Sequence, residues 1–266
     1  MTFKQLTGKD NPLLKTIRKL SRHSGEQMIA EGVRVLEEAE AAQCAIDAVV
    51  ISESFGENER EQKLLRSWQS RCARIYRISA ELFRSISAVE TPQGAIALLR
   101  VPKYSLEMIA PENNALILCA AGIQDPGNMG TLIRTASAAG AHLVCTTPGS
   151  VSARNPKVLR ASAGAFFRIP VIEHLPAEEL LAWRERRSIR IYRTDIREGI
   201  APTRADLVSP CAIVLGNEGN GLNNAAFSQM PSLRIPMSGN AESLNVAAAG
   251  AIILFEAFRQ REAAAS

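Results

Sequence analysis

The segment LRIPMSGNAESLNVAAAGAIILFEAF, residues 233–258, joins a short apolar run, a loop of small residues and an alanine-rich helix. The apolar run ends at Pro236, and we predict that the helix begins at Glu242. Its first turn would then carry the uncharged polar side chains of Ser243 and Asn245 among apolar neighbours. Burying a polar group costs free energy unless it is hydrogen-bonded. The segment therefore indicates a polar site at the start of a core helix.

Upstream of this segment, apolar runs alternate with helical periodicity back to residue 115. We predict strands at 115–120, 142–147, 166–172, 189–194 and 211–216, and helices at 129–140, 155–164 and 176–188. Continuous apolar strands separated by helices are typical of a mainly parallel sheet covered on both faces. The predicted fold class is therefore α/β.

The first hundred residues show a similar alternation on a smaller scale. Strands are predicted at 27–32, 45–52, 73–79 and 94–100, and helices at 11–21, 33–43, 57–70 and 80–87. The stretch VPKYSLEMIAPENN (101–114) contains two prolines and little regular period, which is typical of a linker. We predict a smaller N-terminal α/β domain at 1–103, a linker at 104–114 and a second domain at 115–266.

Composition places the chain among ordinary globular proteins, with 46% hydrophobic and 22% charged residues. The five cysteines are scattered without a CxxC pair or a histidine at ligand spacing, which favours reduced core thiols in a cytoplasmic protein and no metal site. The N-terminus has no apolar signal segment, and the longest uncharged apolar stretch is too short to span a bilayer. We expect a cytoplasmic protein without membrane contact.

The basic residues are clustered although the formal net charge is only +4. Residues 1–23 carry six cations against the single acid Asp10, and residues 151–170 carry four cations and no acid. A third cluster lies within 183–193. Clusters of this kind favour a polyanionic partner, and solvated helix faces are the alternative.

Three loops rich in Gly and Asn follow apolar runs, at 122–136, 215–222 and 235–245. Ligands of open α/β sheets bind beyond the carboxyl ends of the strands, so the three loops indicate a pocket. The spacing in GNEGNG (216–221) does not match the dinucleotide fingerprint, and no phosphate-binding P-loop is present, which makes a nicotinamide-dependent oxidoreductase improbable.

The stretches NMGTLIRTASAAGA (128–141), VLGNEGNGL (214–222) and RIPMSGNAESLNVAAAGAIILFEA (234–257) resemble the three motifs of the SpoU/TrmH family of RNA ribose 2′-O-methyltransferases. MIAEGVRVLEEA (28–39) is similar to the family's N-terminal substrate-binding domain. The resemblance implies a SPOUT fold with a C-terminal trefoil knot and S-adenosyl-L-methionine as methyl donor. It also implies a homodimer with an active site formed across the subunit interface.

The resemblance also implies roles for particular residues. Those expected at the reaction are Asn128, Arg134, Glu218, Ser243 and Asn245. Those expected to bind the cofactor are Thr194, Leu215, Gly216, Asn217, Ile235, Met237 and Leu244. A guanidinium stays protonated in proteins, so we interpret Arg134 as a bidentate donor to the phosphate of the target RNA and to the developing alkoxide. The alternatives are that Arg134 acts as the general base or forms a salt bridge at a subunit interface.

Three of the other four side chains have ordinary structural roles as alternatives: a turn for Asn128, a helix N-terminal charge for Glu218 and an N-cap for Ser243. Asp125 is a weaker candidate for the same site.

The predicted RNA-binding residues are Lys15, Arg18, Lys19, Arg22 and Arg160. Aromatic residues make up only 5% of the chain, which favours a folded RNA recognised by shape over base stacking. The predicted function is methylation of a ribose 2′-hydroxyl in structured RNA. The extra N-terminal domain favours 23S ribosomal RNA by analogy. A transfer RNA methyltransferase and a non-catalytic RNA-binding protein remain the alternatives, and calorimetry with the cofactor separates the last from the first two.

Overall fold

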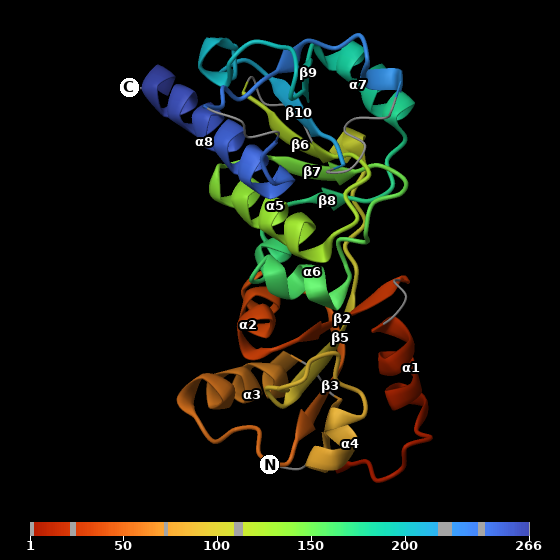
Figure 1. Ribbon diagram of the computed structural model, residues 1–266. Helices are drawn as coiled ribbons and strands as arrows, with labels where there is room; N and C mark the ends of the chain where they lie inside the picture. Colours follow the sequence, from red (N-terminus) through yellow and green to blue (C-terminus); the bar gives the residue numbers. More distant parts are fainter. Residues whose placement is uncertain are drawn as a thin grey trace. The chain divides into compact units, whose positions relative to one another are not determined.

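The apolar runs form two separate sheets in the computed structural model, which describes residues 3–21, 25–71, 74–108, 114–217, 225–238 and 243–265 (Figure 1). The chain divides into two compact units. Unit 1 comprises Met1–Pro102 together with Arg154–Arg168, and unit 2 comprises Lys103–Ala153 together with Ile169–Ser266. Among the described residues, no helix is long and apolar enough to cross a membrane.

Unit 1 is built on a mixed five-stranded sheet of order β1-β4-β3-β5-β2. Its strands are β1 (Lys4–Gln5), β2 (Gln27–Glu31), β3 (Ile46–Ser52), β4 (Ile75–Ile78) and β5 (Ala95–Arg100). The central strand β3 runs parallel to β4 and antiparallel to β5. Because side chains alternate along a strand, Ala48 and Val50 face one layer of helices while Val49 and Ile51 face the other.

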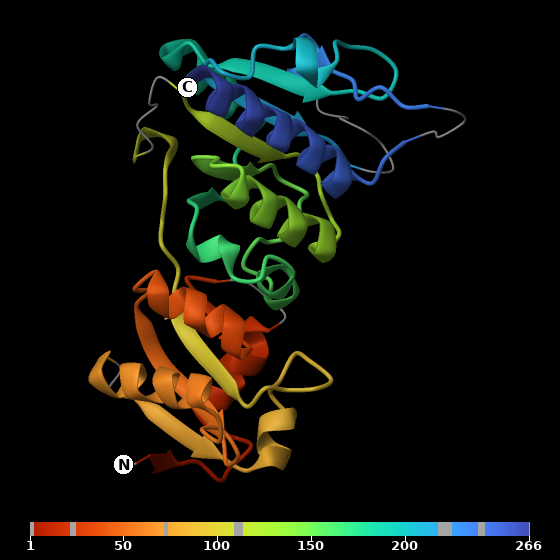
Figure 2. The same ribbon diagram turned by 90° about the vertical axis from the view of Figure 1, so that its left-hand side faces the viewer.

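Helices cover both faces of this sheet (Figure 2). They are α1 (Pro12–Leu20), α2 (Val33–Ala41), α3 (Glu59–Arg71) and α4 (Ala80–Arg84). On one face, Leu14 and Ile17 of α1 pack with Leu82 and Phe83 of α4 over the sheet. The other face is covered by α2 and α3, which contact each other. Asn11 caps α1 through the Leu13 N–H at 2.9 Å, and Pro12 occupies the first helical position as the sequence predicts.

The segment 154–168 packs with unit 1 although it lies more than fifty residues beyond that unit's last strand in the sequence. It contains α6 (Pro156–Ala161) and the 3₁₀ turn η2 (Ala165–Phe167). Arg168 donates to both carboxylate oxygens of Glu38. A Cβ on Gly164, which has φ +82°, would lie 2.5 Å from the Glu38 Cγ, so only glycine fits this approach.

Unit 2 has a six-stranded, all-parallel sheet of order β11-β9-β10-β6-β7-β8. The strands are β6 (Leu116–Ala120), β7 (Leu143–Thr146), β8 (Val171–Ile172), β9 (Arg190–Thr194), β10 (Cys211–Leu215) and β11 (Ser232–Leu233). The central strands β6 and β10 are buried along their whole length, as their continuous apolar sequences predict. The predicted α/β class with a mainly parallel sheet is confirmed.

Three long helices flank this sheet, namely α5 (Pro126–Ala138), α7 (Ala177–Arg187) and α8 (Val246–Ala265). Figure 2 shows α5 and α8 side by side, and Gly250 of α8 faces Leu132 of α5 and Leu215 of β10. On the opposite face of the sheet, Leu180 and Trp183 of α7 pack against the strands. The 3₁₀ turns η1 (Leu106–Met108), η3 (Pro202–Arg204) and η4 (Ala225–Phe227) lie in the connections.

Three of the cysteines are core residues of unit 2, as the sequence predicts. Cys119, Cys145 and Cys211 are free thiols with at most 1% exposure. Cys119 and Cys145 are register partners on β6 and β7. The contact with Cys119, together with burial, raises the pKa of the Cys145 thiol well above its usual value. Burial likewise raises the pKa of Cys211. The thiols of Cys145 and Cys211 therefore stay protonated, and all three cysteines pack as small apolar groups.

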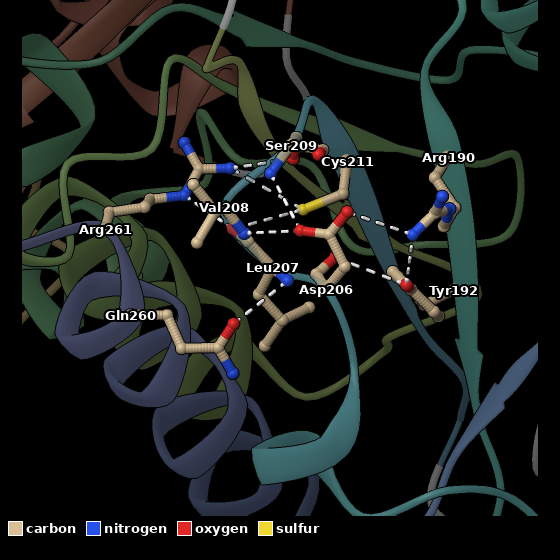
Figure 3. Close-up of polar contacts among 9 residues, drawn as sticks. All are labelled: Arg190, Tyr192, Asp206, Leu207, Val208, Ser209, Cys211, Gln260 and Arg261. Atoms are coloured by element: carbon tan, nitrogen blue, oxygen red, sulfur yellow. Dashed lines mark hydrogen bonds and ion pairs between the residues drawn. The ribbon is translucent and has the colours of Figure 1, made fainter. Parts of the chain in front are cut away.

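The C-terminal end of α8 is tied to the segments before β6 and β10 by the side chain of Arg261. Figure 3 shows the part of this contact before β10, together with Gln260. The Arg261 guanidinium donates to the main-chain carbonyls of Leu207, Asn114, Ala115 and Ser209. Next to it, the Gln260 side-chain oxygen accepts the Leu207 N–H at 3.1 Å. A planar guanidinium with five N–H groups can serve several carbonyls at once, which an ammonium group does less well.

Several predicted element boundaries are wrong. The helices expected at 80–87 and 155–164 end at Arg84 and Ala161. The strand expected at 166–172 is confined to Val171–Ile172, because residues 165–167 form the turn η2. Helix α5 begins at Pro126, three residues before the predicted start, since Asp125 caps it. Helix α8 begins at Val246, with Ser243 and Asn245 before it, whereas the predicted start Glu242 lies outside the described residues.

Candidate functional site

The predicted loops of unit 2 follow strands that end at the same edge of one parallel sheet. Strands β6, β10, β9 and β11 are adjacent in the sheet and parallel, so their carboxyl ends meet. Main-chain bonds join the loops directly beyond these ends, since the Ala121 N–H donates to Leu215 O at 2.8 Å and the Asp195 N–H to Leu233 O at 3.0 Å. This edge is where open α/β sheets bind ligands.

Gly122 is the point at which three of these loops are tied together. Its N–H lies 3.1 Å from the Thr147 Oγ1 and 3.0 Å from the Ser150 Oγ, both in the loop after β7. Its carbonyl accepts the Asn217 Nδ2 from the loop after β10 at 2.7 Å. Gly122 has φ +69°, a conformation that favours glycine. The predicted cofactor residue Asn217 therefore holds the loop after β6 in place through its side chain.

Asn245 and Asn128 meet in a side-chain hydrogen bond between segments 117 residues apart, Nδ2 to Oδ1 at 3.0 Å. The other amide atom of Asn245, Oδ1, accepts the N–H groups of Ala247 and Ala248 at 2.9 and 3.2 Å and so caps α8. The capping role that we considered for Ser243 belongs to Asn245. Asn245 thus serves both the helix start and the residue at the start of α5.

Arg134 lies on α5, where its side chain is exposed and makes no hydrogen bond or ion pair within the part of the chain that the structure describes. Its guanidinium is consequently available to a ligand. Ser243 is also exposed. Glu218, which we expected beside these residues, lies outside the described residues. Asp125 is the N-cap of α5 and accepts the Asn128 N–H at 2.8 Å, so it positions Asn128.

Most of the residues expected to bind the cofactor end these strands or follow them within four residues, whereas Leu244 precedes α8, and their exposure differs. Leu215 is buried at the end of β10, and Gly216 is half-buried beyond it. Ile235 and Met237 are half-buried after β11, whereas Leu244 is 38% exposed. Apolar side chains that are only partly covered, next to main-chain groups at a strand end, suit a flat heterocycle with polar edges.

The loop after β9 is rigidified by an ion-pair network. The Thr194 hydroxyl donates to Val214 O at 3.2 Å, so this predicted cofactor residue ties β9 to β10. Burial tends to raise the pKa of the Asp195 carboxyl, but N–H groups of Arg197 and Glu198 and the Arg193 guanidinium lower it overall. Asp195 is therefore a carboxylate with a structural role beside the strand end.

A cavity of about 580 Å³ in unit 2 does not coincide with the predicted cofactor residues. Its lining is mostly apolar and comes from α5, α8 and the segments near residues 202 and 235, and it includes Pro202, Ile235, Ile252 and Phe255. Ile235 alone belongs to both sets. Ile252 and Phe255 are 45% and 66% exposed. We do not assign this cavity as the cofactor site. It lies along the outer face of α8, and its lining does not include Asn128, Arg134 or Asn245.

The predicted RNA-binding residues lie in unit 1. Lys15 and Lys19 are exposed on α1, and Lys15 pairs with Asp10 at 2.9 Å. Arg18 donates to Lys9 O and to the main-chain and side-chain oxygens of Ser85. Arg22 lies outside the described residues.

Arg160, on α6, is half-buried, and its Nη1 is buried with no hydrogen-bond partner among the described residues. Burial lowers the pKa of Arg160 from its usual value.

Sequence reasoning missed the two hydroxyl residues that hold Gly122. Thr147 and Ser150 are 5% and 9% exposed, and Ser150 also donates to Ala120 O at 3.1 Å. The available signal was the stretch TTPGS (146–150), in which polar residues directly follow an apolar strand. Within the described ranges, no group of three His, Cys, Asp or Glu side chains could hold a metal ion.

Comparison with known proteins identifies both parts of the chain. Residues 115–255 match the SpoU rRNA Methylase family, and residues 11–97 match the MRM3-like substrate binding domain. The chain is similar to the 23S rRNA (guanosine(2553)-2′-O)-methyltransferase RlmP of Bacillus subtilis, with 31% identity over 261 residues that cover 95% of this chain and 98% of that protein.

Two solved structures with bound AdoMet share the architecture. The AdoMet-bound rRNA methyltransferase of Sinorhizobium meliloti is 26% identical, with a TM-score of 0.86, and the match covers 97% of this chain and 98% of that one. The SpoU methyltransferase AviRb of Streptomyces viridochromogenes, in complex with AdoMet, is also 26% identical, with a TM-score of 0.84 and coverage of 95% and 100%. The family predicted from the three motifs is confirmed.

Proposed function

The chain belongs to the SpoU rRNA methylase family, and on that premise we propose that it transfers a methyl group from S-adenosylmethionine to a ribose 2′-hydroxyl in 23S ribosomal RNA. The observation that carries the proposal is the end-to-end match with a 23S rRNA 2′-O-methyltransferase, which covers both units. Residues 1–103 serve as the substrate-binding domain and residues 115–266 as the methyltransferase domain.

The chemistry of the strand-end residues fits S-adenosylmethionine. The partly covered side chains of Ile235, Met237 and Leu244 supply apolar contact area, and the main chain at Gly216 supplies polar groups for the adenosine. Leu215, Thr194 and Asn217 shape the same edge through the bonds that join the loops. When bound there, the cofactor supplies an electrophilic methyl group on a sulfonium centre.

Arg134 stabilises charge on the RNA. A guanidinium does not release its proton near neutral pH, so it does not serve as a base. Its fork binds a phosphate oxygen and the 2′-oxygen as that oxygen releases its proton to solvent water, which makes the hydroxyl more acidic and holds it in line for transfer. Asn128, fixed by Asp125 and Asn245, positions the start of the helix that carries Arg134. Glu218 and Ser243 complete this site.

The outer face of α8 supports the proposal of a homodimer. Ile252 and Phe255 are exposed there, and the ring of Phe255 lies 5.8 Å from that of Phe258. An apolar helix face beside an apolar hollow favours burial against a second copy of the chain. The active site then forms at the subunit interface. The C-terminal segment is threaded into the trefoil knot of the SPOUT fold, and the protein works in the cytoplasm, where its ribosomal RNA substrate is found.

The proposal is tested by two measurements on the intact protein. Isothermal titration with S-adenosylmethionine should show binding, whereas absence of binding would indicate an RNA-binding protein without catalysis. Mapping of ribose methylation in RNA from cells that lack the protein should reveal one unmodified position in 23S rRNA. Loss of a methyl group from a transfer RNA alone would contradict the substrate assignment.

A further inference from the structure

The two helical faces of unit 1 differ in charge. The face formed by α1, α4 and the turn before α1, which we call the α1–α4 face, carries the cations Lys9, Lys15, Arg18, Lys19 and Arg84. Its acids are Asp10 and Glu81. The opposite face is formed by α2 and α3, whose own residues include five acids and five cations. A polyanion would therefore be attracted more strongly to the α1–α4 face, whose cations outnumber its acids.

Two of the five cations of the α2–α3 face, both on α3, form ion pairs with acids of α2. The Arg60 guanidinium binds Glu37 with Nε 2.9 Å from Oε1, and it lowers the pKa of that carboxyl. Arg71 binds Glu40 at 2.6 Å. On the α1–α4 face, Lys15 pairs with Asp10 and Lys9 approaches Glu81 at 3.7 Å. Exposed pairs of this kind are weak and easily exchanged for another anion.

Three cations of the α1–α4 face have no acidic partner among the described residues. Lys19 and Arg84 are exposed and unpaired within this part of the chain. Arg18 is held only by neutral oxygens, with Nη1 2.8 Å from Lys9 O and Nη2 3.2 Å from the Ser85 Oγ. These bonds fix its charge between α1 and the end of α4 and leave further N–H groups free. A charge fixed in advance loses less conformational entropy on binding.

We propose that the α1–α4 face docks the phosphate backbone of a folded RNA, and that the α2–α3 face does not contact it. The proposal rests on the proposed function and names the surface through which unit 1 serves it. It adds Arg84 on α4 to the cations expected on α1 and makes Arg18 a fixed centre of the patch. The contacts are to phosphates, so they hold the RNA in register without reading its sequence.

Deleting residues 1–23 is a poor test of this surface. Leu14 and Ile17 of α1 are fully buried in the core of unit 1, so the deletion would unfold the domain along with removing charge. Substitution of exposed side chains avoids this problem. The test variant is Lys19→Gln with Arg84→Gln, and the matched control is Lys63→Gln with Arg66→Gln on exposed positions of α3. Both pairs remove two positive charges from a formal net charge of +4.

The probe is a full-length, protein-free 23S rRNA transcript, titrated with each intact protein at several salt concentrations. The K19Q/R84Q protein should bind on the order of tenfold more weakly at 0.1 M salt, with a log–log salt slope shallower by about one to two. The K63Q/R66Q protein should bind at least as well as wild type. Affinity for S-adenosylmethionine should be the same in all three proteins.

Equal RNA affinity of K19Q/R84Q and wild type would overturn the proposal, and so would equal weakening by both double variants. Failure of the proposed function has a different signature. In that case the wild-type protein transfers no labelled methyl group to the transcript, whatever the charge variants do.

Discussion

Replacement of Arg261 by Met should destabilise unit 2 strongly, although this side chain is far along α8 from the candidate site. Arg261 bonds four main-chain carbonyls from the segments before β6 and β10. Figure 3 shows Arg261 beside Leu207 and Ser209 of the segment before β10. Asn114 and Ser209 are exposed, so water can replace the guanidinium at their carbonyls. Leu207 and Ala115 are buried, so water cannot easily replace the guanidinium at their carbonyls.

The expected magnitude follows from these two buried carbonyls. The Ala115 carbonyl keeps a second hydrogen bond from the Cys211 N–H at 2.9 Å, so losing the guanidinium costs less free energy at Ala115 than at Leu207. An unsatisfied buried acceptor costs about 1–3 kcal/mol. The sum for Arg261→Met is therefore about 2–4 kcal/mol in the free energy of unfolding. For a unit of this size, each kcal/mol corresponds to roughly 2–4 °C, and the Tm should fall by about 4–16 °C.

The assay is thermal and urea unfolding of the full-length protein, followed by near-ultraviolet circular dichroism. Arg259→Met is the matched control, because Arg259 lies on the same helix but pairs with Glu256 at the surface. Its cost should be at most about 1 kcal/mol. Arg261→Lys keeps the charge without the planar fork and should fall between the two. A Tm for Arg261→Met within 1 °C of the Arg259→Met protein would refute the reasoning.

Three further predictions concern the site and its helices. Arg134→Lys should retain its affinity for S-adenosylmethionine but lose at least about tenfold in methyl-transfer rate, because an ammonium group cannot bind two oxygens in a bidentate manner. A near-wild-type rate in a single-turnover assay would contradict this role. Asn245→Ala removes the cap of α8 and the bond to Asn128, so the free energy of unfolding should fall by about 1–2 kcal/mol and turnover should also fall. Asn245→Asp should keep most of the cap. Denaturant titration measures the loss of stability, and equal stability of the two variants would count against the capping role. Hydrogen bonds from Arg259 and Gln260 lower the pKa of Glu256 to about 2. Its contribution to stability is therefore present above the unfolded pKa near 4.5 and is lost as the pH falls toward 2. Glu256→Gln should flatten the dependence of Tm on pH in that window, and an unchanged profile would argue against this effect.

Much of the fold could be read from local patterns. The continuous apolar runs at 115–120 and 211–216 predict central parallel strands, and the structure has β6 and β10 there, buried throughout. The Asn11-Pro12 pair predicts the start of α1 correctly. These predictions succeed because burial on both faces of a strand, or a cap at a helix start, imposes its own residue types on a short window.

The helix starts in unit 2 were harder, because several residues could cap them. From the sequence we consider only Ser243 as a cap of α8, whereas the course of the backbone makes Asn245 the acceptor for Ala247 and Ala248. In the same way, Asp125 and Pro126 begin α5 earlier than its apolar periodicity suggests. A cap depends on main-chain geometry that a pattern of residue types does not specify.

By itself, the sequence determined the α/β class, the family and the set of loops that could form a site, since apolar periodicity and small-residue motifs are local properties. The tertiary structure alone decided that 154–168 packs with unit 1 through Glu38, that Gly122 joins three loops, and that Arg261 holds the end of α8. Each of these contacts joins residues far apart in the chain. Their partners are selected by the packing of whole elements, and no local window of the sequence contains both sides of the bond.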